Sequence, residues 1–118
     1  MDFAWSEEQT LLRERVAEMA QRELGQDLQQ RDSDGVFDLE GWRKCGQLGI
    51  QGMPIAAEYG GLGLDPLTTV GVLESLGYAC RDNGLLFSLN AHLWTAAIPI
   101  QDFGTEEQKR RFLPDLCN

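Results

Sequence analysis

Residues 54–65 read P-I-A-A-E-Y-G-G-L-G-L-D, and this stretch divides the chain into two helical halves. Its proline and glycines make it too irregular for a helix, and it is too short for a linker between domains. Within it, Glu58 and Tyr59 are expected to be exposed. We predict a loop of fixed shape around which the helices are arranged.

The glycines of this loop permit two interpretations. Backbone amides freed of side chains could hold a phosphate at a helix N-terminus. A dinucleotide-binding fingerprint, however, needs G-x-G-x-x-G after a strand, whereas here Gly61 and Gly63 are followed by Pro66 at the third position and no strand is predicted. We therefore favour a turn in which glycine adopts a positive φ.

Composition limits the classes of partner. The 118 residues suffice for one domain, and 10 basic against 19 acidic residues give a net charge of −9. This charge argues against nucleic acid and against an anionic membrane as partners. No apolar run is long enough to span a bilayer and the N-terminus lacks a signal-peptide pattern, so we expect a cytoplasmic protein.

Metal and redox chemistry have little support in the sequence. Cys45, Cys80 and Cys117 are far apart and contain no C-x-x-C pair, so we expect buried or idle thiols and no metal site. His92 is the single histidine, and we do not assign it as a catalytic base.

Two helices are predicted before the loop. Ser6 and Gln9 have the spacing of a capping box, and the helix that begins there is expected to continue past Gly25 and end before Ser33. Asp38 can cap a second, short helix that ends at Gly49. The step from there into the loop is expected to be extended because it leads to a proline.

After the loop, Asp65 and Pro66 give a strong helix start, and this helix should end near Cys80. Its predicted apolar face consists of Leu67, Val70, Leu73, Leu76 and Gly77. Small residues such as Gly71 and Gly77 should let it approach a neighbour closely.

A nearly uninterrupted apolar segment, Leu85 to Phe103, follows, and we expect a helix buried nearly all round that Pro99 kinks or splits. A second capping box starts at Thr105, and the helix it opens should stop around Pro114. The predicted fold class is therefore all-α, a small bundle of about five helices with the Gly-rich loop between the second and third.

Polar residues inside this apolar helix, chiefly Asn90 and to a lesser degree His92 and Ser88, cost stability unless they are paired or face a cavity. Two interpretations stay open. The helix forms the wall of a ligand site, or Asn90 is a core asparagine hydrogen-bonded to neighbouring backbone.

The order of these segments resembles the N-terminal helical domain of the flavin-dependent acyl-CoA dehydrogenases. The resemblance rests on F-A-W-S-E-E-Q-T-L-L-R-E-R-V, W-R-K-C-G-Q-L-G-I-Q-G-M, the loop at 54–65, the apolar helix pair after it and F-G-T-E-E-Q-K-R-R-F-L-P-D-L. It covers residues 1–118 and implies an oxidoreductase of fatty acid metabolism that uses FAD and a carboxylate base to dehydrogenate an acyl-CoA at its α and β carbons.

The same resemblance implies partners and further domains. It implies an acyl-CoA substrate, an electron-transfer flavoprotein or similar electron acceptor, and a homo-oligomer. In the family a β domain and a second helical bundle follow this helical domain, so we expect the catalytic glutamate and most of the FAD site to lie beyond Asn118. No catalytic or cofactor-binding residue is assigned to this chain, and the 118 residues alone are expected to be inactive.

Substrate-binding residues do carry over. In the family the helix resembling residues 85–98 lines the fatty-chain cavity, which implies that Leu86, Phe87, Asn90 and Trp94 line it here. Leu86, Asn90 and Trp94 share one helix face by spacing. If the resemblance holds, bulky Phe87 and Trp94 should shorten or narrow the cavity.

A second function remains open on the residues themselves. The chain could be a stand-alone binding or interaction module that has lost its flavin domains and holds another chain or an acyl group on its apolar helix faces. A domain made to work alone would be expected to cover such faces.

Overall fold

The computed structural model describes residues 3–118, and within them every regular element is helical. The α-helices are α1 Glu7–Glu23, α2 Leu28–Asp34, α3 Leu39–Gln47, α4 Pro66–Ala79, α5 Asn83–Ala91, α6 Ile98–Phe103 and α7 Glu106–Leu116. A π-helical segment, His92–Ala97, joins α5 to α6, and short 3-10 turns lie at Ile50–Gly52 and Ala57–Tyr59. The predicted all-α class is confirmed.

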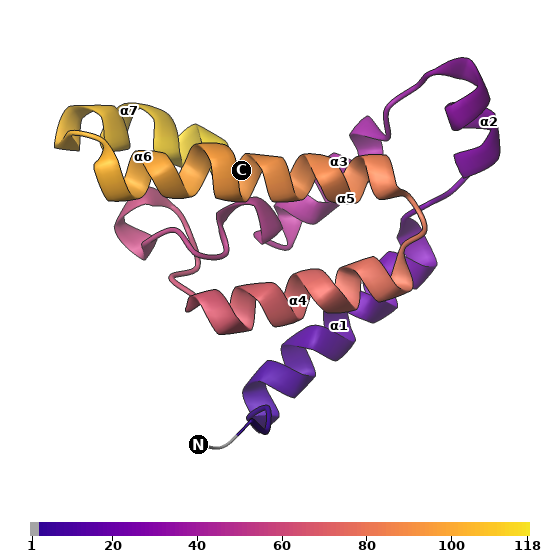
Figure 1. Cartoon of the computed structure of the whole chain (residues 1–118), viewed down its shortest axis with the longest axis horizontal. Coiled ribbons are helices and arrows are strands. Elements are labelled where there is room, and N and C mark those ends of the chain that lie inside the picture. Colours follow the sequence, from indigo (N-terminus) through magenta and orange to yellow (C-terminus); the bar gives the residue numbers. More distant parts are fainter. Residues whose placement is uncertain (1–2) are drawn as a thin grey trace.

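The helices form a layered bundle with one projecting end. Figure 1 shows α5, the π segment and α6 as one long rod, with α4 running below it and α7 turning back along α6. α1 packs against α4, and α2 stands away from the bundle beside the start of α5. The main core lies between α1, α3, α4 and α5, and a second cluster lies where the loop meets the π segment and α7.

The first helix begins as predicted but ends earlier. Ser6 and Gln9 form the capping box, whereas α1 stops at Glu23 and the chain turns through Gly25 (φ 71°) and Asp27 (φ 51°). Both residues are left-handed, a conformation that an α-helix cannot include. The prediction of a continuous helix past Gly25 was therefore wrong, and α2 extends the helical region through Ser33 to Asp34.

The loop at 54–65 is held by backbone hydrogen bonds within itself and to the two residues just before it. The N–H groups of residues 60–64 donate in turn to the carbonyl oxygens of Ala57, Ala56, Gly52, Ile55 and Met53, at 2.8 to 3.2 Å. A Cβ on Gly61 would collide with the Ile55 carbonyl oxygen. These amides are used internally, so the loop has the fixed shape of a turn and offers no cradle for a phosphate.

Tyr59 departs from its predicted exposure. It is buried, and its hydroxyl lies 3.0 Å from a carboxylate oxygen of Glu106 at the start of α7. Glu58, its neighbour, is exposed as expected. The Tyr59 ring thus anchors the loop to α7.

α4 begins and ends as predicted but presents a different face to the core. The Asp65 side chain accepts the Thr68 N–H, and Cys80 is the C-cap. Leu67 and Val70 are 64% and 51% exposed and Gly77 is exposed as well, so the predicted apolar face was wrong at these positions, whereas Leu76 is buried as predicted. The buried face consists of Thr68, Thr69, Gly71, Val72 and Leu76.

Two buried threonines explain this reversal. The Thr68 hydroxyl donates to Asp65 Oδ2 (2.6 Å) and the Thr69 hydroxyl to the Asp65 carbonyl oxygen (3.0 Å), so both enter the core with their polar groups paired. Gly71 permits close approach as predicted, since a Cβ there would lie 2.6 Å from the ring of Trp5. Gly77 does not, because it is exposed and a Cβ there would meet only Leu86, at 3.9 Å.

The last two helical segments also differ from expectation in part. The helix after Asp82 is not buried all round, because Phe87 is 75% and Phe103 is 87% exposed. α7 starts with the predicted capping box at Thr105 but continues through Pro114 to Leu116. A proline this close to the end removes only one helical hydrogen bond, and the Cys117 N–H still donates to the Leu113 carbonyl oxygen (3.0 Å).

Candidate functional site

One face of the long rod fixes it in the bundle. Leu85, Leu89, Leu93 and Ala97 follow one another at every fourth residue and are fully buried. Because side chains at this spacing lie above one another on a helix, they form one continuous buried strip. The neighbouring strip, one residue further along the chain, carries the predicted substrate-binding residues.

Leu86, Asn90 and Trp94 are linked along that neighbouring strip. The Asn90 side-chain N–H donates to the Leu86 carbonyl oxygen at 2.9 Å, and the Trp94 indole N–H donates to Asn90 Oδ1 at 3.1 Å. Leu86 and Asn90 are half-buried, whereas Trp94 is 36% exposed. The structure thus brings these three predicted residues together on one side of the rod.

Phe87, the fourth predicted residue, lies further toward solvent. It stands three residues before Asn90 and seven before Trp94, which places it on the same side of the helix. The four residues therefore form a partly exposed aromatic and amide surface, which we call the α5 face. That this face lines an acyl pocket stays a prediction.

The α5 face runs into the π segment. There the Ile98 N–H reaches back five residues to the Leu93 carbonyl oxygen, as in a π-helix. The Thr95 hydroxyl donates to the Ala91 carbonyl oxygen at 2.6 Å, and Pro99 has no N–H to continue the α-helical ladder. The predicted disturbance before Pro99 is confirmed as a wide turn within a continuous rod.

The other polar residues of the rod have structural partners. His92 Nε2 lies 2.8 Å from the Leu116 carbonyl oxygen, and its ring makes a T-shaped contact with Trp42, with 5.4 Å between the ring centroids. The Ser88 hydroxyl donates to the Gly84 carbonyl oxygen at 2.8 Å. His92 therefore ties the rod to the end of α7, and Asn90 alone of the three belongs to the α5 face.

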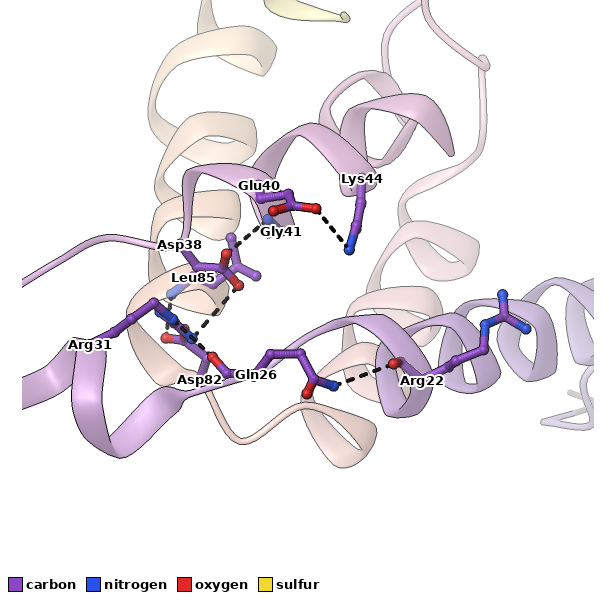
Figure 2. Close-up of polar contacts among 9 residues, drawn as sticks. All are labelled: Arg22, Gln26, Arg31, Asp38, Glu40, Gly41, Lys44, Asp82 and Leu85. Atoms are coloured by element: carbon purple, nitrogen blue, oxygen red, sulfur yellow. Dashed lines mark hydrogen bonds and ion pairs between the residues drawn. The ribbon is translucent and has the colours of Figure 1, made fainter.

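Away from the α5 face, a hollow of about 950 Å³ opens between the end of α1, α2 and the turn before α5. At its base, Arg31 Nη1 lies 2.9 Å from Asp82 Oδ2, and Nη2 lies 3.7 Å from Asp38 Oδ2. Figure 2 shows the guanidinium between the two carboxylates. Because two acids already neutralise Arg31, we assign this hollow a structural role.

Arg31 was missed by sequence reasoning. Asp38 was predicted as a helix cap and Asp82 also caps a helix, and each uses one oxygen for that purpose, to accept the N–H of Gly41 and of Leu85 respectively. Their second oxygens are the signal that a cation should lie nearby. The sequence does not show which cation, since Arg31 approaches them only through the turn after α1.

The thiols and acids of the described residues form no metal centre. In residues 3–118, no group of three or more His, Cys, Asp and Glu residues could hold a metal ion. Cys45, Cys80 and Cys117 are free and buried, as predicted. Burial, followed by the nearby Cys80 and Asp38, raises the pKa of the Cys45 thiol to about 12.

Among the helices of residues 3–118, none is long and apolar enough to cross a membrane.

Known proteins show the same architecture. The chain is 38% identical over 117 residues to the short-chain specific acyl-CoA dehydrogenase of Clostridium acetobutylicum, covering 99% of this chain and 30% of that relative. The crystal structure of the prolyl acyl carrier protein oxidase AnaB superimposes with a TM-score of 0.93 at 47% identity, over 97% of this chain and 30% of that one. A structure of PigA with FAD and proline superimposes with a TM-score of 0.90 at 38% identity, over 99% of this chain and 30% of that one.

The chain spans about 30% of the length of the curated relatives it matches. The family model described as acyl-CoA dehydrogenase, N-terminal domain, matches residues 6–118. The chain therefore belongs to the acyl-CoA dehydrogenase family and corresponds to the N-terminal domain of its members.

Proposed function

We propose that this chain is the N-terminal helical domain of an FAD-dependent dehydrogenase that removes hydrogens from the α and β carbons of an acyl thioester. The observation that carries the proposal is the match of residues 6–118 to this domain of the family. The FAD complex of PigA, a relative at 38% identity, supports the choice of cofactor.

The glycine-rich loop of this chain does not offer a site for the FAD phosphates. The loop at 54–65 is the glycine-rich segment, and the N–H groups of residues 60–64 already donate to backbone carbonyl oxygens. We therefore assign FAD binding and the catalytic base to other parts of the longer enzyme. FAD, when bound, supplies the hydride acceptor.

The role proposed for this chain is to form one side of the acyl-binding pocket with the α5 face. Leu86, Phe87, Asn90 and Trp94 offer apolar and aromatic surface with one amide, which is the composition of a pocket for an acyl chain. Their partial exposure supports this role, because a fully buried helix would have no surface left for a ligand. Trp94 and Phe87 are large, so we expect them to limit the length or width of the acyl group.

The exposed aromatic side chains argue against the stand-alone module. Tyr78, Phe87 and Phe103 are among the large apolar residues that this chain leaves uncovered. A domain that works alone would be expected to cover such surface. We therefore favour a domain that works inside a larger enzyme.

Acyl groups on a carrier protein are a second candidate substrate class. The specific observation is the 47% identity to AnaB, whose substrate is named as a prolyl acyl carrier protein. In this alternative the thioester is the same but the acyl group is a prolyl residue, and a carrier protein takes the place of CoA.

The remaining assignments complete the proposal. We propose an electron-transfer flavoprotein or similar protein as the acceptor, and a homo-oligomer as the assembly, both on the family resemblance. The free, buried cysteines support a reducing compartment such as the cytoplasm.

An anaerobic titration of the full-length enzyme that carries this domain tests the proposal. The purified protein should absorb in the visible region as a flavoprotein, and stoichiometric acyl-CoA should bleach that absorbance. If a prolyl carrier protein bleaches the flavin and acyl-CoA does not, the substrate belongs to the second class. A colourless protein, or a flavin that neither thioester bleaches, would contradict the proposed function.

A further inference from the structure

We infer that Asn90 is a positioning residue for the indole of Trp94. Its role on the α5 face is then to orient the ring, because both polar groups of its amide are occupied by neighbours within the rod. The expected effect on acyl selectivity rests on the proposed function. The position of the Trp94 ring, however, can be tested without any measurement of activity.

The orientation of the Asn90 amide is determined by two neighbours of opposite polarity. Its N–H group donates to the Leu86 carbonyl oxygen at 2.9 Å, and its oxygen accepts the Trp94 indole N–H at 3.1 Å. Rotating the amide by half a turn would place oxygen against oxygen and N–H against N–H. Only one orientation therefore satisfies both neighbours.

The indole needs such a partner because of where it lies. Trp94 belongs to the π segment His92–Ala97, and the side-chain partner of its indole is Asn90, four residues earlier. Its ring is 36% exposed, so packing alone does not fix it. The hydrogen bond to Asn90 lays the indole back along the rod, over the preceding turn.

The bond should matter most when a ligand covers the ring. An acyl group on the α5 face would exclude water, and an indole N–H without water or a partner carries the full cost of an unpaired donor. Asn90 pairs that donor before the ligand arrives, so the ring can present its apolar face to an acyl group. Asn90 then selects acyl groups through the position of Trp94.

A double-mutant cycle in the full-length enzyme separates this role from direct contact. N90L removes both hydrogen bonds at nearly constant volume, and W94F removes the indole N–H while keeping an aromatic ring. We expect N90L to change the ratio of kcat/KM for octanoyl-CoA over butyryl-CoA by about 3- to 10-fold, in the same direction as W94F. In the W94F background, N90L should change that ratio less than about 2-fold.

The variant N90D separates the two hydrogen bonds, because its carboxylate still accepts the Trp94 indole N–H but has no N–H for the Leu86 carbonyl oxygen. Its ratio should lie nearer to the wild type than that of N90L. An equal effect of N90L in the wild-type and W94F backgrounds would overturn the inference, because Asn90 would then act without Trp94. A uniform loss of kcat/KM for both substrates would overturn it as well, since that is the effect of a merely structural residue.

Fluorine NMR of the enzyme labelled with 5-fluorotryptophan tests the geometry without turnover. The chain contains Trp5, Trp42 and Trp94, and the resonance missing in W94F identifies the third of these. N90L should shift or broaden that resonance alone. An unmoved resonance overturns the inference. A moved resonance in a protein that reacts with no acyl thioester supports the positioning role and contradicts the proposed function.

Discussion

Arg31 joins the aspartates that start two different helices. Its guanidinium lies 2.9 Å from Asp82, the N-cap of α5, and 3.7 Å from Asp38, the N-cap of α3. The side chains of Arg31 and Asp82 are only 17% and 8% exposed. One cation in α2 therefore fixes where the rod that carries the α5 face begins.

Replacing Arg31 should destabilise the chain strongly. R31M keeps most of the apolar stem but leaves two mostly buried carboxylates without their cation, at a cost of about 2–4 kcal/mol in the free energy of unfolding. Urea denaturation followed by circular dichroism measures this. The control is R22A, which removes the exposed Arg22–Glu23 pair and should cost less than about 0.5 kcal/mol. Equal effects of the two variants would show that Arg31 is not a structural cation.

Asp65 should make stability depend on pH in the acid range. The hydroxyl of Thr68, and then its N–H, hold the pKa of Asp65 below its usual value. A lowered folded-state pKa means that the stabilisation is complete above the ordinary aspartate pKa of about 3.9 and disappears as the pH falls through the lowered value.

D65N tests this assignment, because asparagine also caps helices but does not titrate. The urea midpoint of D65N should fall less steeply than that of the wild type between pH 5 and pH 2. If the urea midpoints of D65N and the wild type fall in parallel with pH, Asp65 does not contribute to the acid sensitivity.

The three thiols should be inert in the folded chain. All are buried, and burial raises the pKa of each, to about 12 for Cys45. Since the thiolate is the reactive form, Ellman's reagent at pH 8 should label none of them rapidly, and all three after denaturation. Fast labelling of a native thiol would contradict the burial described for it.

The two loop glycines Gly61 and Gly63 should tolerate alanine very differently. In G61A the new methyl group meets the Ile55 carbonyl oxygen, so the loop must open, and we expect a loss of at least about 2 kcal/mol. Gly63 has a φ of 63° but open space around it, so G63A should cost only the strain of a left-handed residue, about 1–2 kcal/mol. Thermal unfolding of both variants tests whether G61A is the less stable of the two. If G61A were more stable than G63A, the loop would not be closed on itself.

Features that depend on neighbouring residues were predictable from the sequence. Each predicted N-cap residue bonds to a group three residues further along the chain, so four consecutive residues contain the whole interaction. These N-caps are Ser6, Asp38, Asp65 and Thr105. The spacing of Leu86, Asn90 and Trp94 likewise predicts that they share one face.

Features that depend on distant residues were not predictable. The turn after α1 needs a left-handed Asp27, which the contacts of Arg31 with the Gln26 carbonyl oxygen and with Asp82 stabilise. The buried face of α4 was misjudged because hydropathy alone ranks Val70 above Thr69. The threonine is buried because its hydroxyl is already paired within the helix.

The acyl selectivity of W94A in the full-length enzyme tests the central claim most directly. Removing the indole from the α5 face should lengthen the pocket, so the relative kcat/KM for longer acyl-CoA substrates should rise, while F103A, which removes an exposed ring from the far end of the rod, should leave the profile unchanged. The account predicts a shift of the preferred chain length toward longer acyl groups in W94A alone. An unchanged profile in W94A would contradict it and remove the α5 face from the acyl site.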